Sequence, residues 1–426
     1  MSNSTPSKPK NLVSRFFSAL GPGVIAGAAD DDPSGIATYS IAGAQLGTSL
    51  LWTAFLTWPL MAAVQMMCAR IGMVTGRGLA GALRQKFPKP VMVIVCVLLV
   101  TANTINIGAD LTAMADAAEL LSGVDSHLLV VLFGVGITYA TIRLRYYQIA
   151  RILKWLALSL FSYIITAFVV GPDWGAVAKD AFIPSLPRGP AAWATLVAIL
   201  GTTISPYLFF WQASQEVEEE KAMGRVLLVN RQGATPREIL KRKLDVGVGT
   251  FFSNLVMFFI ILTTALVLNT HGITQLDTSA QVAEALRPLA GSFAMTLYTA
   301  GILGVGFLAI PILAGSAAYA FAETFNWTEG LDNKLGQAWS FYSIIILSIL
   351  VGIAIDWIGI NPIKALFWTA VINGLLAPFL LIGILAVASD AAIMNNQPSS
   401  RLGRSVVLAT TLLMFGAAIG MFAFAE

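Results

Sequence analysis

The chain alternates long apolar stretches with short polar connections from Ala19 almost to its end. Each stretch holds about 20 residues, the length that an α-helix needs to cross the ~30 Å hydrocarbon core of a bilayer. The stretch at 289–322 contains several glycines and Pro311, so it could be one kinked helix or two. The pattern predicts an all-α membrane protein with eleven spans, at residues 19–46, 50–72, 91–121, 128–144, 147–170, 191–214, 246–268, 289–322, 338–355, 361–387 and 406–425.

Composition strengthens this assignment. Of the 426 residues, 57% are hydrophobic and 12% are charged, whereas soluble domains carry about 25% charged residues. The spans leave no room for a sizeable soluble domain, so we expect one transmembrane domain at 16–425. Residues 1–15 are polar and lack the apolar core and cleavage site of a signal peptide, which predicts a disordered cytoplasmic tail.

The distribution of basic residues predicts the topology, because lysine and arginine accumulate on the cytoplasmic side of membrane proteins. With the N-terminus inside, 22 of the 26 lysines and arginines fall on cytoplasmic segments. The other side keeps only Lys179, Arg188, Arg287 and Lys364. We therefore expect a multi-pass cell-membrane protein with a cytoplasmic N-terminus and an extracellular C-terminus.

The remaining charge and cysteine patterns exclude other classes. The net charge of +3 follows from the loop bias, and no basic patch is interleaved with aromatic residues, so nucleic acid is not an expected partner. Cys68 and Cys96 lie inside predicted spans and are expected to be buried free thiols. The charged loop at 216–244 is expected to be a solvated cytoplasmic connector. The sequence does not reveal the oligomeric state, and a monomer is the working expectation.

Two spans are interrupted by polar, helix-breaking residues. The first contains Asp-Asp-Asp-Pro-Ser-Gly at 30–35, and the sixth contains Gly-Thr-Thr-Ile-Ser-Pro at 201–206. Proline prevents the helix from continuing, and non-helical backbone within a bilayer persists only where protein or a water-filled cavity satisfies it. The breaks stand five helices apart, which predicts an inverted repeat of about 16–170 and 190–390, with an additional eleventh helix at about 405–425.

The three consecutive aspartates are the most informative residues. A carboxylate near the centre of a membrane helix costs at least ~2.5–3.5 kcal/mol on insertion scales. Capping of the following half-helix could account for one of Asp30, Asp31 and Asp32, but not for all three. We therefore predict that at least one of them binds a metal ion. The oxygen-rich surroundings favour a hard cation such as Mg²⁺.

Further polar residues lie at membrane depth. Thr202 and Ser205 are three residues apart and share a face if the turn is helical, although such side chains often bond only to their own backbone. The third span carries Asn106 and Asp110, and Asp110 either lies on the ion path or makes a structural polar contact. Asn373 in the tenth span is either an oxygen ligand or a helix–helix hydrogen-bond partner.

At these motifs the sequence resembles the Nramp superfamily of divalent metal transporters, and within it the Nramp-related magnesium transporters. The resemblance covers nearly the whole chain and implies the LeuT fold, with alternating access around a midplane site. Both broken helices belong to that fold. Its landmarks here are Gly21-Pro22-Gly23, Asp32-Pro33, Leu51-Trp52, the segment from Arg70 to Gly76, Ile107 to Asp110, and Pro206.

The chain departs from the transition-metal members at their ligand positions. Their Asp-Pro-Gly-Asn motif is replaced by residues 32–35, so that Asp32 is kept and Gly35 stands where the Asn ligand would be. Their Met-Pro-His motif is replaced by residues 205–207, so that Ser205 takes the place of the methionine. A second family histidine falls on Gln212, and a family glutamate falls on Ala113.

The resemblance and its departures together imply a transporter of Mg²⁺, and also of Mn²⁺, that uses no cofactor. A roomier site at Gly35 suits a partly hydrated ion, because magnesium dehydrates reluctantly. The missing histidine and glutamate imply uptake without proton coupling. The expected metal site comprises Asp32, Asp31, Gly35, Thr202, Ser205 and Asn373, with Thr202 acting through its carbonyl and Asp31 included only for its charge and proximity; the expected ion pathway comprises Asp30, Asp110 and Tyr207.

Three alternatives remain open at this stage. A proton-coupled Mn²⁺ or Fe²⁺ importer would share the family but not the ion preference. A sodium-coupled symporter of an organic solute would share the fold, although three adjacent aspartates argue against an anionic substrate. An intramembrane aspartyl protease would need two carboxylates that share a proton, such as Asp32 and Asp110, but no further signature supports it. We therefore expect that the chain is not an enzyme.

Overall fold

The structure is a computed structural model that describes Gly27 and residues 29–144, 158–185 and 189–424. The expected tail at 1–15, most of the first half of span one and the first half of span five lie outside the described residues. Within the described residues every regular element is helical. The main helices are α3 (Pro33–Leu46), α4 (Trp52–Thr75), α6 (Lys89–Ser122), α7 (Ser126–Arg143), α9 (Phe161–Val170), α11 (Pro190–Thr203), α12 (Pro206–Ala222), α14 (Pro236–Val267), α17 (Ala294–Phe325), α18 (Trp339–Asp356), α19 (Pro362–Ser389) and α20 (Arg401–Ala423), and the short ones are α5 (Leu79–Leu83), α10 (Trp174–Phe182), α13 (Leu228–Arg231), α15 (Ser279–Ala283) and α16 (Arg287–Ala290).

The all-α membrane architecture is confirmed. Nine helical segments of the described residues are long and apolar enough to span a bilayer, and the pair α11–α12 forms one of them. The described halves of the first and fifth spans, α3 and α9, are shorter. The ambiguous stretch at 289–322 contains a single long helix, α17, which runs through Pro311 without interruption.

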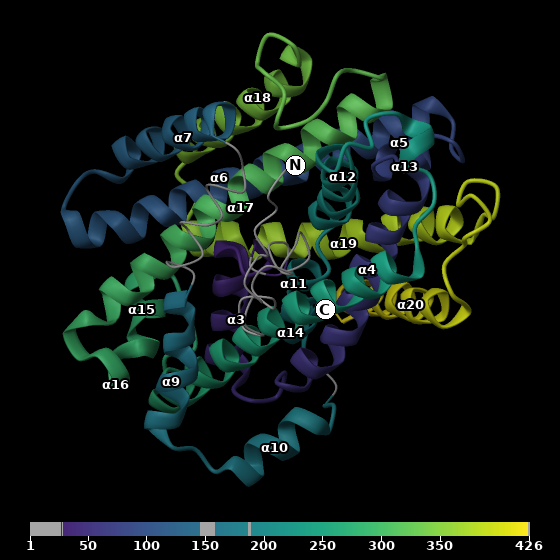
Figure 1. Ribbon diagram of the computed structural model, residues 1–426. Coiled ribbons are helices and arrows are strands. Elements are labelled where there is room, and N and C mark those ends of the chain that lie inside the picture. The colour runs from purple at the N-terminus through teal and green to yellow at the C-terminus, as the bar shows by residue number, and fades with distance from the viewer. Residues whose placement is uncertain (1–26, 28, 145–157, 186–188, 425–426) are drawn as a thin grey trace, which may run out of the picture.

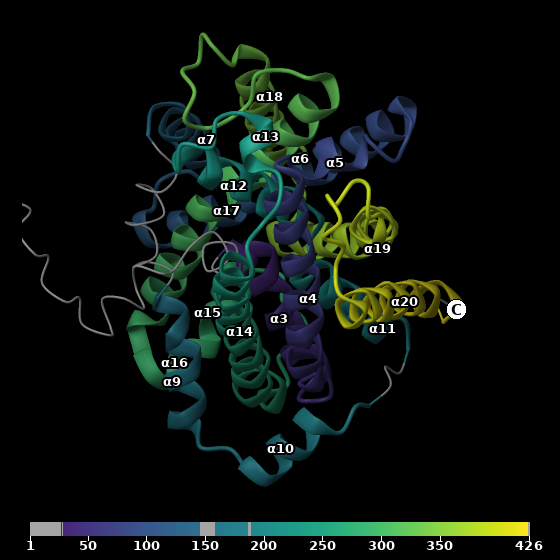
Figure 2. The same cartoon turned by 45° about the vertical axis from the view of Figure 1, so that its right-hand side comes forward.

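The short helix α3 lies near the centre of the bundle (Figure 1). It packs against α14, α11, α19 and α6, so that parts of the chain far apart in sequence surround it. Its residues from Pro33 to Ala44 are all buried, which fits a run of small and apolar side chains with no polar stripe. The helix α20 lies at the edge, beside α19 and α11 (Figure 2).

The connecting segments separate into two ends of the molecule. The short helices α5 and α13 lie at one end, and α10 lies at the opposite end (Figures 1 and 2). The charge pattern assigns the segments that contain α5 and α13 to the same side of the membrane and the segment that contains α10 to the other. The assignment of the α5 end to the cytoplasm stays a prediction.

The expectation of a solvated connector at 216–244 is wrong for its two flanks. The helix α12 continues to Ala222, and α14 begins at Pro236, ten residues before the predicted start, with a capping box between Thr235 and Glu238. Glu216 and Arg242 are 2% and 6% exposed. The physical reason is pairing, because opposite charges on two packed helices can be buried together when their hydrogen bonds are satisfied.

Arg242 is the centre of this buried ion cluster, which joins α12 to the start of α14. Its guanidinium lies 2.7 Å from Glu216 Oε1 and 2.6 Å from Asp245 Oδ2, and it also bonds to Glu219. Gln212 Nε2 donates to Glu216 Oε1 at 2.6 Å, one turn deeper along α12. The cluster therefore fixes α12, one of the two helices that form the sixth span, to its neighbour.

Replacing Arg242 by methionine is expected to destabilise the protein strongly. The change leaves the carboxylates of Glu216 and Asp245 buried without their cation, and removing one partner of a buried ion pair costs about 3–5 kcal/mol. The readout is the thermal unfolding midpoint of the purified protein. Lys241→Met is the matched control, because Lys241 is exposed on the same helix. Equal midpoints for the two variants would contradict the expectation.

Candidate metal site

The first span is broken at the aspartates. Asp30 ends a helical turn, Asp31 and Asp32 are non-helical, and α3 begins at Pro33. Asp32 is the N-cap of α3, since its Oδ1 accepts from the backbone N–H of Gly35 at 2.8 Å and from Ser34 Oγ at 2.6 Å. Capping is the structural role that the sequence allowed for one aspartate. The cap uses only Oδ1 of Asp32, so Oδ2 is available for other contacts.

The second oxygen of Asp32 faces neutral groups on two other helices. Its Oδ2 lies 3.2 Å from Asn106 Nδ2 on α6 and 3.5 Å from the hydroxyl of Tyr207 on α12. The Tyr207 hydroxyl makes a shorter bond, 3.1 Å, to the carbonyl of Ala29. Asn106 Nδ2 also lies 3.2 Å from Asp110 Oδ2. Because a side-chain amide carries two N–H donors, Asn106 can bridge the two carboxylates.

Asp30 and Asp31 meet a different partner. Ser253 Oγ, on α14, lies 2.7 Å from Asp30 Oδ2 and 3.2 Å from Asp31 Oδ1. A hydroxyl has one proton and can donate to only one of these carboxylates at a time. The other oxygen of Asp30, Oδ1, is buried and accepts no hydrogen bond from any of the described residues.

Taken together, Asp30, Asp31, Asp32 and Asp110 form a group of four buried acids. They are 0%, 4%, 1% and 0% exposed. In the described part of the chain, none of the ion pairs involves any of them. Uncompensated charges of one sign are very costly in a protein interior within a membrane, so such a group needs protons or a cation.

The second break lies directly beside the first. Ile204 and Ser205 separate α11 from α12. Ser205 Oγ lies within hydrogen-bond distance of the carbonyl oxygens of Gly201 and Thr202, at 2.9 Å and 2.6 Å, and can donate to one of them at a time. The backbone role that the sequence left open for Ser205 is thus realised. Its oxygen and the carbonyl of Thr202 each keep a lone pair that can still face a cation.

Gly35 and Thr202 bring the two breaks into contact. A Cβ atom added at Gly35 would lie 3.2 Å from Thr202 Oγ1 and 3.3 Å from the carbonyl of Asp30. The space that glycine was expected to open is filled in this conformation by Thr202 and by the ring of Tyr39, whose nearest atom would be 3.4 Å away. Gly35 therefore permits close packing here, and any larger cavity requires α3 and α11 to separate.

The tenth span completes the surroundings. Gly374 on α19 packs directly on Gly201, since a Cβ on Gly201 would lie 2.3 Å from the Gly374 nitrogen. The adjacent residue Asn373 is 2% exposed, and within the described structure its Oδ1 accepts no hydrogen bond. An unused amide oxygen next to the sixth-span break is consistent with a ligand position.

Two residues that the sequence reasoning left out of the site are now placed within it: Asn106, which bridges Asp32 and Asp110, and Ser253, which contacts Asp30 and Asp31. Each had a signal, because each is polar inside an apolar span. No group of three or more histidine, cysteine or acidic side chains in the described residues is disposed to hold an ion together.

Comparisons with known proteins agree with this architecture. Residues 23–423 match the family described as natural resistance-associated macrophage protein-like, or Nramp. The divalent metal cation transporter MntH of Aeromonas hydrophila is 25% identical over 91% of this chain and 92% of its own length. A manganese transporter of Eremococcus coleocola superposes with a TM-score of 0.75 at 19% identity, covering 98% of this chain and 90% of that one. Mhp1, a nucleobase-cation-symport-1 family transporter, superposes with a TM-score of 0.58 at 14% identity, covering 95% and 92%. The chain therefore belongs to the Nramp family, whose members are membrane transporters and not enzymes.

Proposed function

We propose that this Nramp protein carries Mg²⁺, and also Mn²⁺, across the cell membrane by alternating access. The observation that supports this most is the chemistry around Asp32. The groups that hydrogen-bond to its carboxylate are a backbone N–H, hydroxyls and an amide. The neighbouring helix break carries Ser205, a hydroxyl, where the resemblance places a methionine in the transition-metal members.

The donor set favours a hard, partly hydrated ion. Magnesium usually keeps several waters and is held by one or two carboxylates, whereas thioether and imidazole ligands favour softer metals. Asp32 supplies one carboxylate. The carbonyl of Thr202, the hydroxyl of Ser205 and the amide oxygen of Asn373 supply neutral oxygens near the breaks. Manganese accepts the same ligands, and the names of the relatives above agree with a divalent metal as substrate.

The calorimetric titration of the purified protein with Mg²⁺, Ca²⁺ and Mn²⁺ tests this proposal directly. We expect magnesium to bind, and a tenfold excess of magnesium over manganese to compete with it measurably. Binding of manganese that is insensitive to magnesium would instead support a manganese importer of the parent family. That second candidate is favoured by one observation, since the unpaired carboxylates Asp30 and Asp31 could also accept protons.

We further propose the membrane arrangement that the charge pattern predicts. Two inverted repeats, about 16–170 and 190–390, would surround the site, and α20 would be the additional helix. The α5 end would face the cytoplasm together with the N-terminus. Labelling of single cysteines introduced at Asp173, at the α10 end, and at Gln232, at the α5 end, by an impermeant reagent in intact cells tests this orientation. Labelling of position 232 and not 173 would reverse it.

Uptake of magnesium is expected to occur without matching proton movement. The position of a family histidine holds Gln212, an amide that does not titrate, and it is bonded to Glu216. His127 lies at the start of α7, where its half-exposed ring bonds to Asp356. A pH-sensitive dye inside proteoliposomes should therefore report no acidification during magnesium uptake. A proton ionophore added at the end provides the dye control, and acidification that scales with magnesium flux would refute the uncoupled mechanism.

A further inference from the structure

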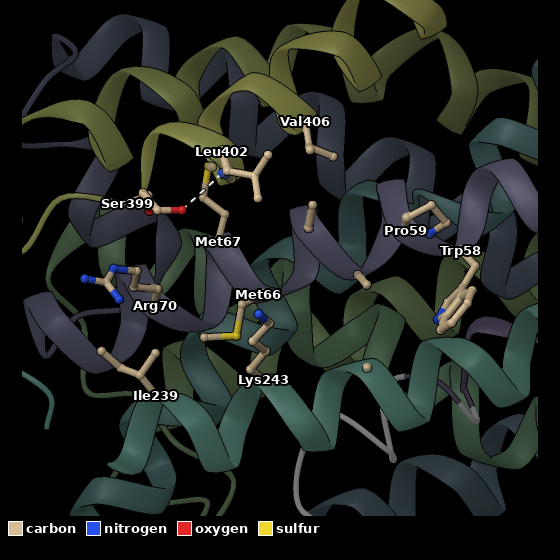
Figure 3. A pocket seen from close by; sticks show the side chains of 15 residues that line it. Trp58, Pro59, Met66, Met67, Arg70, Ile239, Lys243, Ser399, Leu402 and Val406 are labelled. Atoms are coloured by element: carbon tan, nitrogen blue, oxygen red, sulfur yellow. Dashed lines mark hydrogen bonds between the residues drawn. The ribbon is translucent and has the colours of Figure 1, made fainter. Parts of the chain in front are cut away.

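A groove of about 580 Å³ lies between α4, α14 and α20 (Figure 3), and none of the candidate metal-site residues lines it. Its walls are mainly apolar, and among the described residues no acidic side chain lines it. The apolar part is formed chiefly by Trp58, Pro59, Ala62, Met66, Leu402 and Val406. The polar lining residues are Arg70, Lys243, Ser399 and Ser400; Arg70 and Ser399 lie toward one end, and Lys243 lies beside Met66 (Figure 3).

The shape of the groove follows the face of α4. Trp58, Ala62, Met66 and Arg70 succeed one another at intervals of four residues, so they lie along one side of the helix. Trp58 and Arg70 are twelve positions apart, which corresponds to about 18 Å along the helix axis. This length is close to the ~15 Å hydrocarbon depth of one leaflet. The groove is thus an apolar channel of leaflet depth that ends in basic residues.

The basic end has unused donors. Arg70 Nη2 donates to the carbonyls of Gln397 and Pro398, at 3.1 Å and 3.4 Å, but its buried Nε has no hydrogen-bond partner among the described residues. Ser399 is 5% exposed, and its hydroxyl also has no partner. Lys243 is exposed and takes part in none of the ion pairs of the described residues. Buried donors normally find partners, so this end is suited to an external acceptor.

We propose that this groove binds one anionic glycerophospholipid from the surrounding membrane. The phosphate would lie at Arg70, Lys243 and Ser399, and one acyl chain would follow the apolar face of α4. Arginine and lysine together recognise phosphate oxygens, and basic pockets between membrane helices commonly hold anionic headgroups. The lipid would connect α20 to α14, which is one of the helices that pack against α3. This inference does not depend on the ion that the protein carries.

The headgroup end is tested with Lys243→Gln, because Lys243 makes no ion pair that the change would break. Lys241→Gln is the matched control, since Lys241 lies on the same helix but does not line the groove. The measurement is native mass spectrometry of the delipidated protein titrated with phosphatidylglycerol, with phosphatidylcholine in parallel. The wild type and the control should bind phosphatidylglycerol in preference, and Lys243→Gln should bind it roughly fivefold more weakly. Unchanged binding in this variant would overturn the proposal.

The acyl-chain end is tested with Gly247→Leu. Gly247 lies one helical turn from Lys243, and a Cβ added there would meet no atom within 4 Å. The leucine should therefore fill the groove without disturbing the helix packing, and it should remove bound phosphatidylglycerol while the unfolding midpoint of the delipidated protein is kept. Phosphatidylglycerol that stays bound to Gly247→Leu, or equal binding of phosphatidylglycerol and phosphatidylcholine by the wild type, would overturn the proposal. So would inorganic phosphate that raises the unfolding midpoint as much as phosphatidylglycerol does. A lipid-independent dimer that Gly247→Leu dissociates would also overturn it.

Discussion

Asp32→Asn is expected to abolish magnesium uptake in proteoliposomes while the protein still folds. Asparagine is as good an N-cap as aspartate, so the bonds from Gly35 and Ser34 that start α3 are kept. The charge on the oxygen that faces Asn106 and Tyr207 is lost. Removing this carboxylate leaves an ion with neutral ligands only. We expect flux at the level of empty liposomes and no heat of magnesium binding.

Two further variants interpret this result. Asp32→Ala removes the cap as well as the charge, and it should also be inactive but less stable by about 1 kcal/mol. Asp356→Asn is the matched control, because Asp356 is also a buried acid, 6% exposed, but its hydrogen-bond partners are Thr112 on α6 and His127 on α7. It should transport normally. Magnesium flux that persists in Asp32→Asn would contradict the assignment of Asp32 as the central ligand of the proposed site.

The two helix breaks could be predicted from sequence because their signals are local. A helix interruption is indicated within a few residues at each site, by the three acids before Pro33 and by Ser205 before Pro206. The spans were predictable for the same reason, since an apolar stretch of sufficient length has few alternatives in a bilayer. The long helix α17 was uncertain because its glycines and Pro311 could either end a helix or be accommodated within one by packing neighbours.

What could not be predicted depends on contacts between distant segments. Glu216 and Arg242 looked like part of a solvated charge block, because glutamate and arginine are usually found at protein surfaces. They are paired only by the packing of α12 against α14. The sequence likewise could not assign separate roles to the two carboxylate oxygens of Asp32, because helix capping and metal binding both use an aspartate. The sequence suggested room at Gly35, whereas the structure places Thr202 and Tyr39 against it.

The predicted metal ligands are buried in this conformation, so ion access depends on how the surrounding helices move. The predicted ligands Asp32, Thr202, Ser205 and Asn373 are all 1–2% exposed in the described part of the structure. The alternating access that we propose would therefore require the packing of α3 on α11, and of α11 on α19, to loosen on one side at a time. The glycines at these contacts, Gly35, Gly201 and Gly374, allow close approach without interlocking side chains.

Ser205→Met should shift the preference of the site from magnesium toward manganese. The hydroxyl of Ser205 bonds to the carbonyls of Gly201 and Thr202, and a methionine would replace it with a thioether that stabilises softer metals. We expect the ratio of manganese to magnesium affinity, measured by calorimetry, to rise roughly tenfold, which is about 1.4 kcal/mol. Ser205→Ala separates the two effects, because it removes the hydroxyl without adding sulfur, and it should leave the ratio unchanged.

Gly35→Asn added to Ser205→Met should raise the ratio further only if Thr202 Oγ1, 3.2 Å from the new Cβ, can move aside. An equal ratio in Ser205→Met and Ser205→Ala would show that position 205 does not contact the ion.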